Sequence, residues 1–381
     1  MIHLVTIKNE NEMKKRILLT TILLFSIGFI FAQKYEFTPV KDIYTSSVKN
    51  QGMTGTCWSF SSSSFIESEI ERISGQKIDI SEMYIVRTTY DKKAWNYVMR
   101  QGTAQFSEGG LAHDLMNAAR SNGLMPQEAF TGLIGQQTLY NHSKLVPDMK
   151  EILDKFIAKD PNQSNWKSPI KSILDKDIGA YKTSFNYNGK TYTPKEFLAM
   201  TKLNPDDYVT FTSFTHQPVY AKFILAIPDN FSNGKFYNLS LEEYMIVMDH
   251  AINNGYTVEL DIDVSEPTFS QKNGVAFIPK SKTENEKGLH EIVDEMVITP
   301  AFRQAEFENY NTTDDHLMHV TGIYKDQKGN KYYKVKNSWG THVGNGGFIY
   351  ISEPYMQLKS ISIMIHKDAI PHKIRKKLLT L

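Results

Sequence analysis

The chain has 381 residues, enough for one large domain or two lobes, either of which can bury a substantial core. A composition of 41% hydrophobic and 22% charged residues is that of an ordinary globular protein, which excludes the disordered and fibrous classes. The formal net charge of +1 gives no reason to expect nucleic acid as a partner.

The first predicted element is a secretory signal peptide over residues 1–32. A basic start at residues 14–16 precedes an apolar run over residues 17–31 and then Ala32. This run is short for a membrane span, which needs ~20 residues. We therefore expect an exported protein, periplasmic or secreted, with no stable membrane span after cleavage. The true start can be Met13, an uncleaved anchor is the alternative, and without a working signal the protein is cytoplasmic.

Cys57 is the only cysteine, so the chain cannot form an internal disulfide and its stability has to come from its core. A lone cysteine is usually inert and buried. In an oxidising compartment, however, a free thiol is a liability unless it is buried or used.

Three helices are predicted from apolar residues at helical spacing. The first begins at Cys57, is about 18 residues long and ends at Gly75, where a C-cap glycine is expected. The second runs from Leu111 to about Ser121. The third follows a capping box of Ser240 with Glu243 and ends before Gly255. Between the second and the third, residues 131–207 mix short helical patterns with turns and are interpreted as an elaborating insertion.

From Tyr256 the hydrophobic period changes to two, which predicts strands in "YTVELDIDV", "HVTGIY", "KYYKVKNSW" and "GFIYIS". The segment Lys325–Lys331, "KDQKGNK", reads as a hairpin connection. Helices come first and antiparallel strands last, which favours an α+β fold of two lobes with a cleft between them.

Cys57 stands where a thiol can become a nucleophile. The unpaired N–H groups at a helix N-terminus lower a thiol's pKa, and a nearby imidazolium lowers it further. If the two strands joined by Lys325–Lys331 pair, His316 and Asn337 come close together, and the Asn337 amide oxygen can fix the ring tautomer. Gln51 would donate its amide N–H, with the Cys57 backbone N–H, to an oxyanion.

Other residues near these motifs have competing interpretations. Gly109 and Gly110 have no side chains, so a substrate backbone could lie against them. Glu108 could shape the substrate pocket but is more often a solvated loop carboxylate.

The histidines and aspartates around His316 also have plainer roles. His319 falls on the opposite strand face from His316 and is interpreted as a packed or partly exposed residue, and His342 as a loop residue. Asp314 and Asp315 could tune the pKa of His316 or simply be polar residues at a strand entry. No residue cluster has the spacing of metal ligands, so we expect neither a metal nor a cofactor.

Four motifs resemble those of the papain-like cysteine peptidases, namely "NQGMTGTCWSF", "SEGG", "DHLMHVTG" and "KNSWGTHVGNGGFIYI". They are most similar to the branch of bleomycin hydrolase and aminopeptidase C, from about Phe37 to Arg375. The resemblance implies a helical lobe and an antiparallel β lobe with an active-site cleft between them. Within a peptidase domain over 33–381, it gives a helical lobe at about 50–130, the insertion at 131–207, a helix and β lobe at about 208–365, and a basic tail at 366–381.

The resemblance also implies roles for individual residues. Cys57 is the nucleophile and His316 the general base and then acid. Asn337 orients the ring, Trp339 covers the Asn–His hydrogen bond from water, and Gln51 is the oxyanion donor. The implied reaction is peptide-bond hydrolysis through a thioester acyl-enzyme, with peptides as partners and, in many relatives, a homo-hexamer.

The C-terminus departs from this pattern. Enzymes of the branch end in a longer arm that lies in the cleft, so that only a substrate amino terminus fits, whereas this chain stops at Leu381. An aminopeptidase is predicted, and an endopeptidase with an open cleft is the alternative. A non-catalytic binding module and an acyltransferase on the same scaffold are the remaining alternatives. The basic tail is interpreted as a solvated end, in preference to a nucleic-acid or membrane contact.

Overall fold

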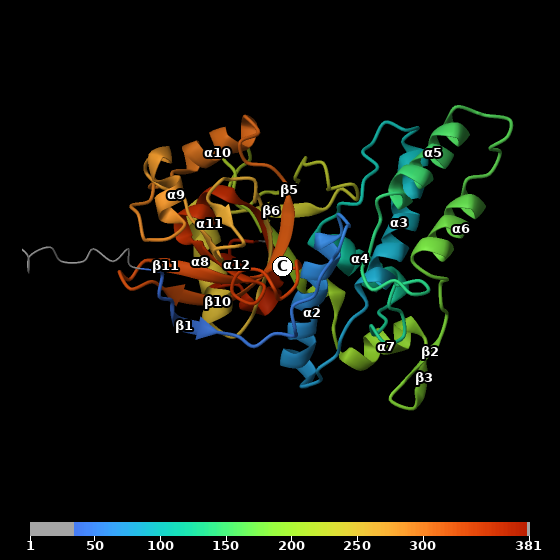
Figure 1. The fold of residues 1–381 in the computed structure, drawn as a ribbon, viewed down its shortest axis with the longest axis horizontal. Helices are drawn as coiled ribbons and strands as arrows, with labels where there is room; N and C mark the ends of the chain where they lie inside the picture. Colours follow the sequence, from blue (N-terminus) through green and yellow to red (C-terminus); the bar gives the residue numbers. More distant parts are fainter. Residues whose placement is uncertain (1–33, 379–381) are drawn as a thin grey trace, which may run out of the picture.

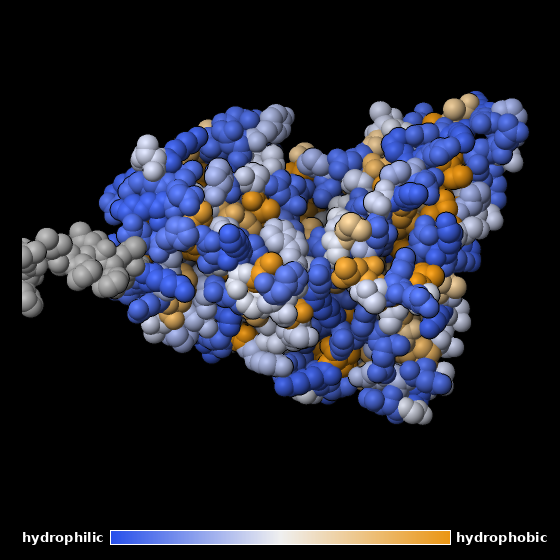
Figure 2. Space-filling view, in the orientation of Figure 1, coloured by the Kyte–Doolittle hydropathy of each residue, from blue (hydrophilic) through white to orange (hydrophobic). Residues whose placement is uncertain are grey.

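The computed structural model describes residues 34–378, which form two lobes side by side with helix α2 between them (Figure 1). The space-filling view shows the molecule notched between the lobes (Figure 2). The predicted α+β class with two lobes is therefore confirmed.

The helical lobe gathers around one hydrophobic core. Its elements are α2 (Cys57–Ser74), α3 (Glu82–Met99), α4 (Ala112–Asn122), α5 (Leu145–Ile157), α6 (Lys167–Asp177), α7 (Pro194–Thr201) and the hairpin of β2 (Phe185–Tyr187) with β3 (Lys190–Tyr192). Met149, Leu174 and Phe197, from the predicted insertion, are buried in the same core as Phe65 of α2. The insertion thus enlarges this lobe.

The β lobe is built on an eleven-stranded sheet. Its elements are β1 (Thr38–Asp42), β4 (Tyr208–Thr212), β5 (Lys222–Ile224), β6 (Lys235–Asn238), α8 (Leu241–Asn253), β7 (Val258–Ile262), β8 (Phe269–Ser270), β9 (Val275–Ala276), α9 (Asn285–Gly288), α10 (Pro300–Glu308), β10 (His316–Lys325), β11 (Lys331–Lys336), β12 (Phe348–Ser352), α11 (Glu353–Lys359), β13 (Ser360–His366) and α12 (His372–Arg375). The predicted antiparallel pairing holds for most of this sheet, with two exceptions, because β4 pairs with β6 and β12 with β9 in parallel.

The structure confirms some features of the predicted helices and corrects others. Helix α2 ends as expected, at Gly75 with a left-handed φ of 71° and its N–H bonded to the Glu71 carbonyl. For α8 only half of the capping box forms, since Ser240 accepts from the Glu243 N–H while the Glu243 carboxylate binds Tyr220 and Lys377. Helix α3 was not predicted, because apolar and polar residues are buried around nearly its whole circumference and leave no stripe.

The predicted hairpin at Lys325–Lys331 is confirmed and sets the position of two residues discussed below. Strands β10 and β11 pair antiparallel, with His319 opposite Lys336. His316 is the first residue of β10, and Asn337 is the first residue after β11. Strand pairing therefore brings these two side chains to the same end of the sheet.

Helix α2 packs on the sheet through small side chains. The Ser61 hydroxyl donates to the Glu259 carboxyl group of β7 at 3.2 Å, and the Ser64 hydroxyl lies 2.9 Å from His319 Nδ1 on β10. Serine side chains let the helix approach the sheet closely while satisfying buried polar groups of the strands. This packing fixes where the first turn of α2 lies relative to β10.

We expect Glu259 to make stability depend on pH. Its side chain is almost completely buried, and that burial raises the pKa of the carboxyl group to about 8. A carboxyl with a raised folded-state pKa contributes stability that is full below its unfolded pKa and is lost as pH rises through the folded pKa. The free energy of unfolding of Glu259→Gln, relative to that of the wild type, should therefore rise by on the order of 3 kcal/mol between pH 5 and pH 9.

Urea unfolding at several pH values measures this difference. Glu286→Gln is the matched control, because the Glu286 side chain is 87% exposed. Parallel stability curves for Glu259→Gln and the wild type would contradict the assignment.

None of the helices within residues 34–378 is both long enough and apolar enough to cross a membrane. The predicted signal peptide lies outside the described residues.

Candidate active site

Cys57 begins α2 at the end of a tightly held turn. Gly52 has a φ of 62°, and a Cβ there would lie 2.5 Å from the Tyr140 carbonyl oxygen, so only glycine fits. The Gly55 N–H donates to the Glu108 carboxylate at 2.6 Å. Glu108 is therefore neither a free pocket residue nor a merely solvated one, because it fastens the turn that positions Cys57.

The environment of the Cys57 thiol favours its neutral form. Burial raises its pKa to about 12, the backbone groups of Leu317 and Trp58 lower it by hydrogen bonding, and the charges of Asp229 and Asp314 raise it. The expectation that the helix N-terminus sets a low pKa is wrong for this arrangement, since burial outweighs it. The contact with Leu317 nevertheless places the sulfur against the residue that follows His316.

The structure brings His316 and Asn337 together. His316 Nε2 lies 2.8 Å from Asn337 Oδ1, and both side chains are buried. Asn337 Oδ1 also accepts from the Ser338 N–H at 2.7 Å, and Asn337 Nδ2 donates to Gln271 Oε1 at 3.0 Å. These bonds fix the amide orientation, so Nε2 carries the proton and Nδ1 is the basic nitrogen of the neutral ring.

One face of the His316 ring is covered by another aromatic ring. The Trp339 ring lies over it with a centroid separation of 4.9 Å, where it can shield the bond to Asn337 from water. Burial lowers the pKa of His316 to about 4, while the hydrogen bond to Asn337 raises it. Within the described residues Nδ1 has no hydrogen-bond partner, and no hydrogen bond joins the ring to the Cys57 thiol. Catalytic hydrogen bonds are often long in a free enzyme and tighten only with substrate.

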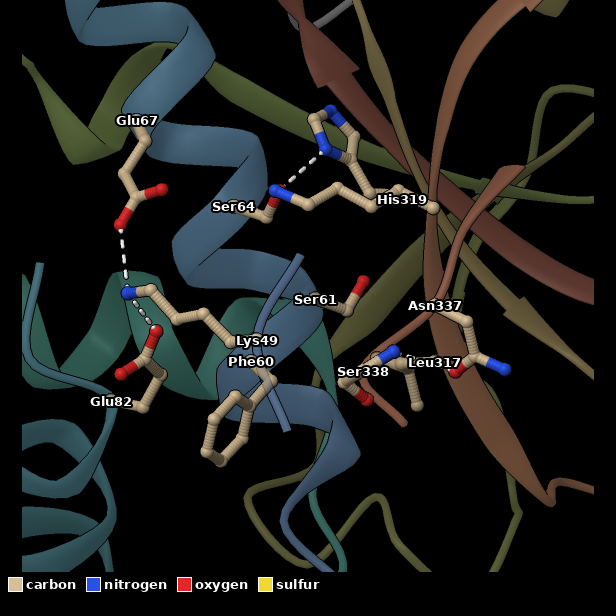
Figure 3. Close-up of a pocket in the computed structure, with 11 residues that line it drawn as sticks. Lys49, Phe60, Ser61, Ser64, Glu67, Glu82, Leu317, His319, Asn337 and Ser338 are labelled. Carbon is tan, nitrogen blue, oxygen red and sulfur yellow. Dashed lines mark hydrogen bonds and ion pairs between the residues drawn. The ribbon is translucent and has the colours of Figure 1, made fainter. Parts of the chain in front are cut away.

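His319 lies away from this site. It is fully buried on the other face of β10, and Figure 3 shows it beside Ser64, apart from Asn337. The interpretation as a packed strand residue fits this position. His342 is exposed in the loop after β11.

Gln51 joins the turn before Cys57 to the segment after β11. Its Nε2 donates to the Thr54 carbonyl at 2.7 Å, its Oε1 accepts from the Ser338 hydroxyl at 2.6 Å, and its backbone N–H donates to the Ser338 carbonyl at 2.8 Å. One amide hydrogen is thus occupied, which leaves the second for an oxyanion.

Gly109 and Gly110 lie against other side chains. A Cβ on Gly109 would fall 1.9 Å from an Asp229 carboxylate oxygen, and one on Gly110 would fall 3.1 Å from the Trp58 ring. The Trp58 indole N–H donates to the Glu108 carbonyl at 3.0 Å. The bare backbone at Gly109 therefore makes room for Asp229.

Three residues of this site were missed in the sequence, namely Gln271, Ser338 and Asp229. Ser338 was visible within "KNSWG", where its hydroxyl had no assigned role. Gln271 and Asp229 lie in loops far along the chain, and neither belongs to a local pattern.

The C-terminal segment packs on the β lobe. Leu378 and Ile374 are buried in its core, and the Lys377 ammonium contacts Glu243 at 2.8 Å and the Tyr220 hydroxyl at 2.9 Å. The interpretation of the basic tail as a solvated end is therefore wrong for the residues up to Leu378, because the apolar side chains of this segment pack into the core of the β lobe. Residues 379–381 lie outside the described part.

Comparisons with known proteins cover nearly the whole chain. A model of the "Papain family cysteine protease" family matches residues 33–173, and one of the "Peptidase C1-like family" matches residues 179–380. The chain is 20% identical to Aminopeptidase C of Listeria monocytogenes, over 90% of this chain and 85% of that protein. It is 22% identical to Aminopeptidase C of Lactococcus lactis subsp. cremoris, over 86% and 82%. The crystal structure of PepW from Lactobacillus rhamnosis HN001 superposes with a TM-score of 0.72 at 18% identity, over 90% of this chain and 84% of that one.

Proposed function

The chain belongs to the Peptidase C1-like family, and from this premise we propose that it is a cysteine aminopeptidase of the bleomycin hydrolase type. Its substrates are peptides, from which it removes residues at a free amino end. The similarity to several proteins named Aminopeptidase C, over more than four fifths of each chain, supports this activity.

The catalytic roles are proposed as follows. The Cys57 thiol gives its proton to His316 Nδ1, and the thiolate attacks the scissile carbonyl carbon. Gln51 Nε2 and the Cys57 backbone N–H donate to the resulting oxyanion. The imidazolium then protonates the leaving amine, the C–N bond breaks and a thioester remains. Water, deprotonated by His316, hydrolyses the thioester and frees the thiol.

The buried environment supports proton transfer within this pair. Alone, the thiolate and the imidazolium are each disfavoured by burial, as their pKa values of about 12 and about 4 indicate. A single transfer from sulfur to ring creates both charges together, and each then stabilises the other. The bond from Nε2 to Asn337 keeps the ring in the tautomer that can accept the proton.

One observation favours action at an amino end over cleavage within a chain. The loop between β5 and β6 leaves the β lobe and contacts the helical lobe beside Cys57. The Asp229 N–H donates to Asp314 Oδ2, just before His316, at 3.3 Å, while the Asp229 carboxylate lies against Gly109. Ser232 of this loop contacts His113 of α4 at 2.9 Å. From these contacts we infer that the loop closes one side of the site to a substrate chain that runs past Cys57.

A pair of fluorogenic substrates tests this proposal. We expect the amide of alanine with 7-amino-4-methylcoumarin to be cleaved at least about 100-fold faster than its N-acetyl derivative, because the loop leaves no room for a residue before the first. Efficient cleavage of the acetylated substrate would establish an endopeptidase. Transfer of the acyl group to an added amine in place of water would establish an acyltransferase.

Two further properties are proposed from the sequence alone. We infer that the protein is exported, periplasmic or secreted, through the signal over residues 1–32. We also propose assembly into a homo-oligomer, as the family resemblance implies.

A further inference from the structure

We propose that the Asp229 carboxylate binds the terminal ammonium of the substrate, so that the enzyme takes peptides with a free, protonated amino terminus. This inference rests on the proposed aminopeptidase function and adds the group that recognises the amine. In this chain the recognition element is a side chain in the middle of the sequence, in the loop between β5 and β6.

The position of Asp229 is fixed from both lobes. Its backbone is held by Asp314 of the β lobe, and its carboxylate contacts the backbone of Gly109 in the helical lobe. The neighbouring Gly110 packs on the ring of Trp58, the residue after Cys57. Asp229 is therefore held close to the proposed nucleophile.

The carboxylate has acceptor capacity to spare. Its contacts are long ones, to Gln105 Nε2 at 3.4 Å and to the Ser107 hydroxyl at 3.5 Å, and within the described residues it has no ion-pair partner. A carboxylate offers about four acceptor sites. An ammonium carries three donors and would satisfy the sites that remain.

Lys93 does not fill this role. Its side chain is buried, its ammonium donates to the Gly109 carbonyl oxygen and it lies 5.1 Å from the centre of the Phe231 ring. Burial lowers the pKa of Lys93 to about 8, although the charge of Asp229 raises it, and burial raises the pKa of Asp229 while the charge of Lys93 lowers it. Asp229 is half-buried, and an ammonium that reaches it would gain a partly desolvated ion pair.

Covalent geometry makes this location selective. The amino nitrogen and the carbonyl carbon of one residue are only about 2.5 Å apart, as standard bond lengths and angles dictate. A carboxylate can hold a terminal ammonium while the adjacent carbonyl meets the thiol only if it lies beside that thiol. Asp229 meets this condition through its contact with Gly109, since the next residue, Gly110, packs on the ring of Trp58, which follows Cys57. The charge of Asp229 also raises the pKa of the Cys57 thiol.

Binding of free and capped peptides to inactive protein tests the proposal. In a Cys57→Ala background, trialanine should bind at least about 30-fold more tightly than N-acetyl-trialanine, and Asp229→Asn should weaken the binding of trialanine and leave only the steric part of that preference. Asp294→Asn is the matched control, because the Asp294 side chain is 79% exposed. Calorimetric titration measures each affinity.

Steric exclusion is separated from charge recognition by a third ligand. A trialanine analogue with a hydroxyl in place of the amino group has the same size and no charge. We expect it to bind the Cys57→Ala protein about 30-fold more weakly than trialanine, and to bind the Asp229→Asn variant as well as trialanine does. Equal binding of both ligands to the Cys57→Ala protein would overturn the proposal, even if the Asp229 variant failed to fold.

A labelling rate gives a readout independent of cleavage. With Cys57 intact, Asp229→Asn should react faster with iodoacetamide at pH 7, because loss of the negative charge lowers the thiol pKa. A preference for trialanine over its hydroxyl analogue that survives Asp229→Asn, in a variant labelled faster than the wild type, would overturn the proposal for Asp229 and leave the aminopeptidase assignment standing. Absence of any peptide cleavage by the wild type would overturn both.

Discussion

Replacing Cys57 by alanine should lower kcat/KM for peptide cleavage by about 10⁴-fold or more, the range seen when a nucleophile is removed from an acyl-transfer site. No other thiol in the chain can substitute, since Cys57 is the only cysteine. His316→Ala should be similarly damaging, because the pKa of the thiol, at about 12, leaves almost no thiolate at neutral pH without a base. Initial rates with the alanine coumarin amide measure both effects.

Two controls accompany these variants. His290→Ala removes a histidine whose side chain is 64% exposed and should leave the rates unchanged. Labelling with iodoacetamide should occur in the wild type and vanish in Cys57→Ala, which counts reactive thiols directly. Cleavage retained by a folded Cys57→Ala protein would refute the thioester mechanism, and a folded wild type with an intact thiol that cleaves no peptide would favour a binding module.

The second large effect concerns stability, and we expect Lys49→Met to destabilise the fold by about 3–5 kcal/mol at pH 8. The Lys49 ammonium lies among three carboxylates, those of Glu67, Asp79 and Glu82, whose oxygens could otherwise hold a cation. Figure 3 shows Lys49 between Glu67 and Glu82. The Glu67 and Glu82 side chains are only 3% and 1% exposed. Without the ammonium, buried negative charges lose their compensation.

The effect of Lys49→Met should shrink at low pH. Burial raises the pKa of Glu82 to about 7 even with Lys49 present, so protonation below that pH relieves the uncompensated charge. The double variant Lys49→Met with Glu82→Gln should recover part of the loss. Lys176→Met, at a side chain that is 79% exposed, is the control. Urea unfolding at pH 5 and pH 8 measures all four proteins, and a loss that does not depend on pH would contradict this account.

Much of the fold and part of the candidate site could be predicted from local patterns in the sequence. The apolar spacing after Cys57 gave α2 its length and its C-cap, and period-two alternation gave β10, β11 and their hairpin. From that hairpin the meeting of His316 with Asn337 follows by strand pairing alone. Such features are readable because they depend on residues close together in sequence.

The remainder depends on contacts between distant segments. Asp229 reaches Gly109 across 120 positions, and nothing in "AIPDN" distinguishes it from an ordinary loop carboxylate. The thiol pKa was mispredicted for the same reason, because its burial arises from residues of both lobes. The prediction for the C-terminal segment rested on its charge, whereas its packing is determined by the apolar side chain of Leu378.

The serines of α2 that contact the sheet fix the position of one lobe relative to the other. Ser61 and Ser64 are bonded to Glu259 and His319, and the Lys336 ammonium also donates to Ser64 at 2.8 Å. If the helix moved along the sheet by a few ångströms, all these buried groups would lose their hydrogen-bond partners, at a free-energy cost that rises steeply with the displacement. These bonds hold the helix on the sheet behind the reaction centre, so the thiol and the imidazole keep a constant separation although they come from opposite halves of the molecule.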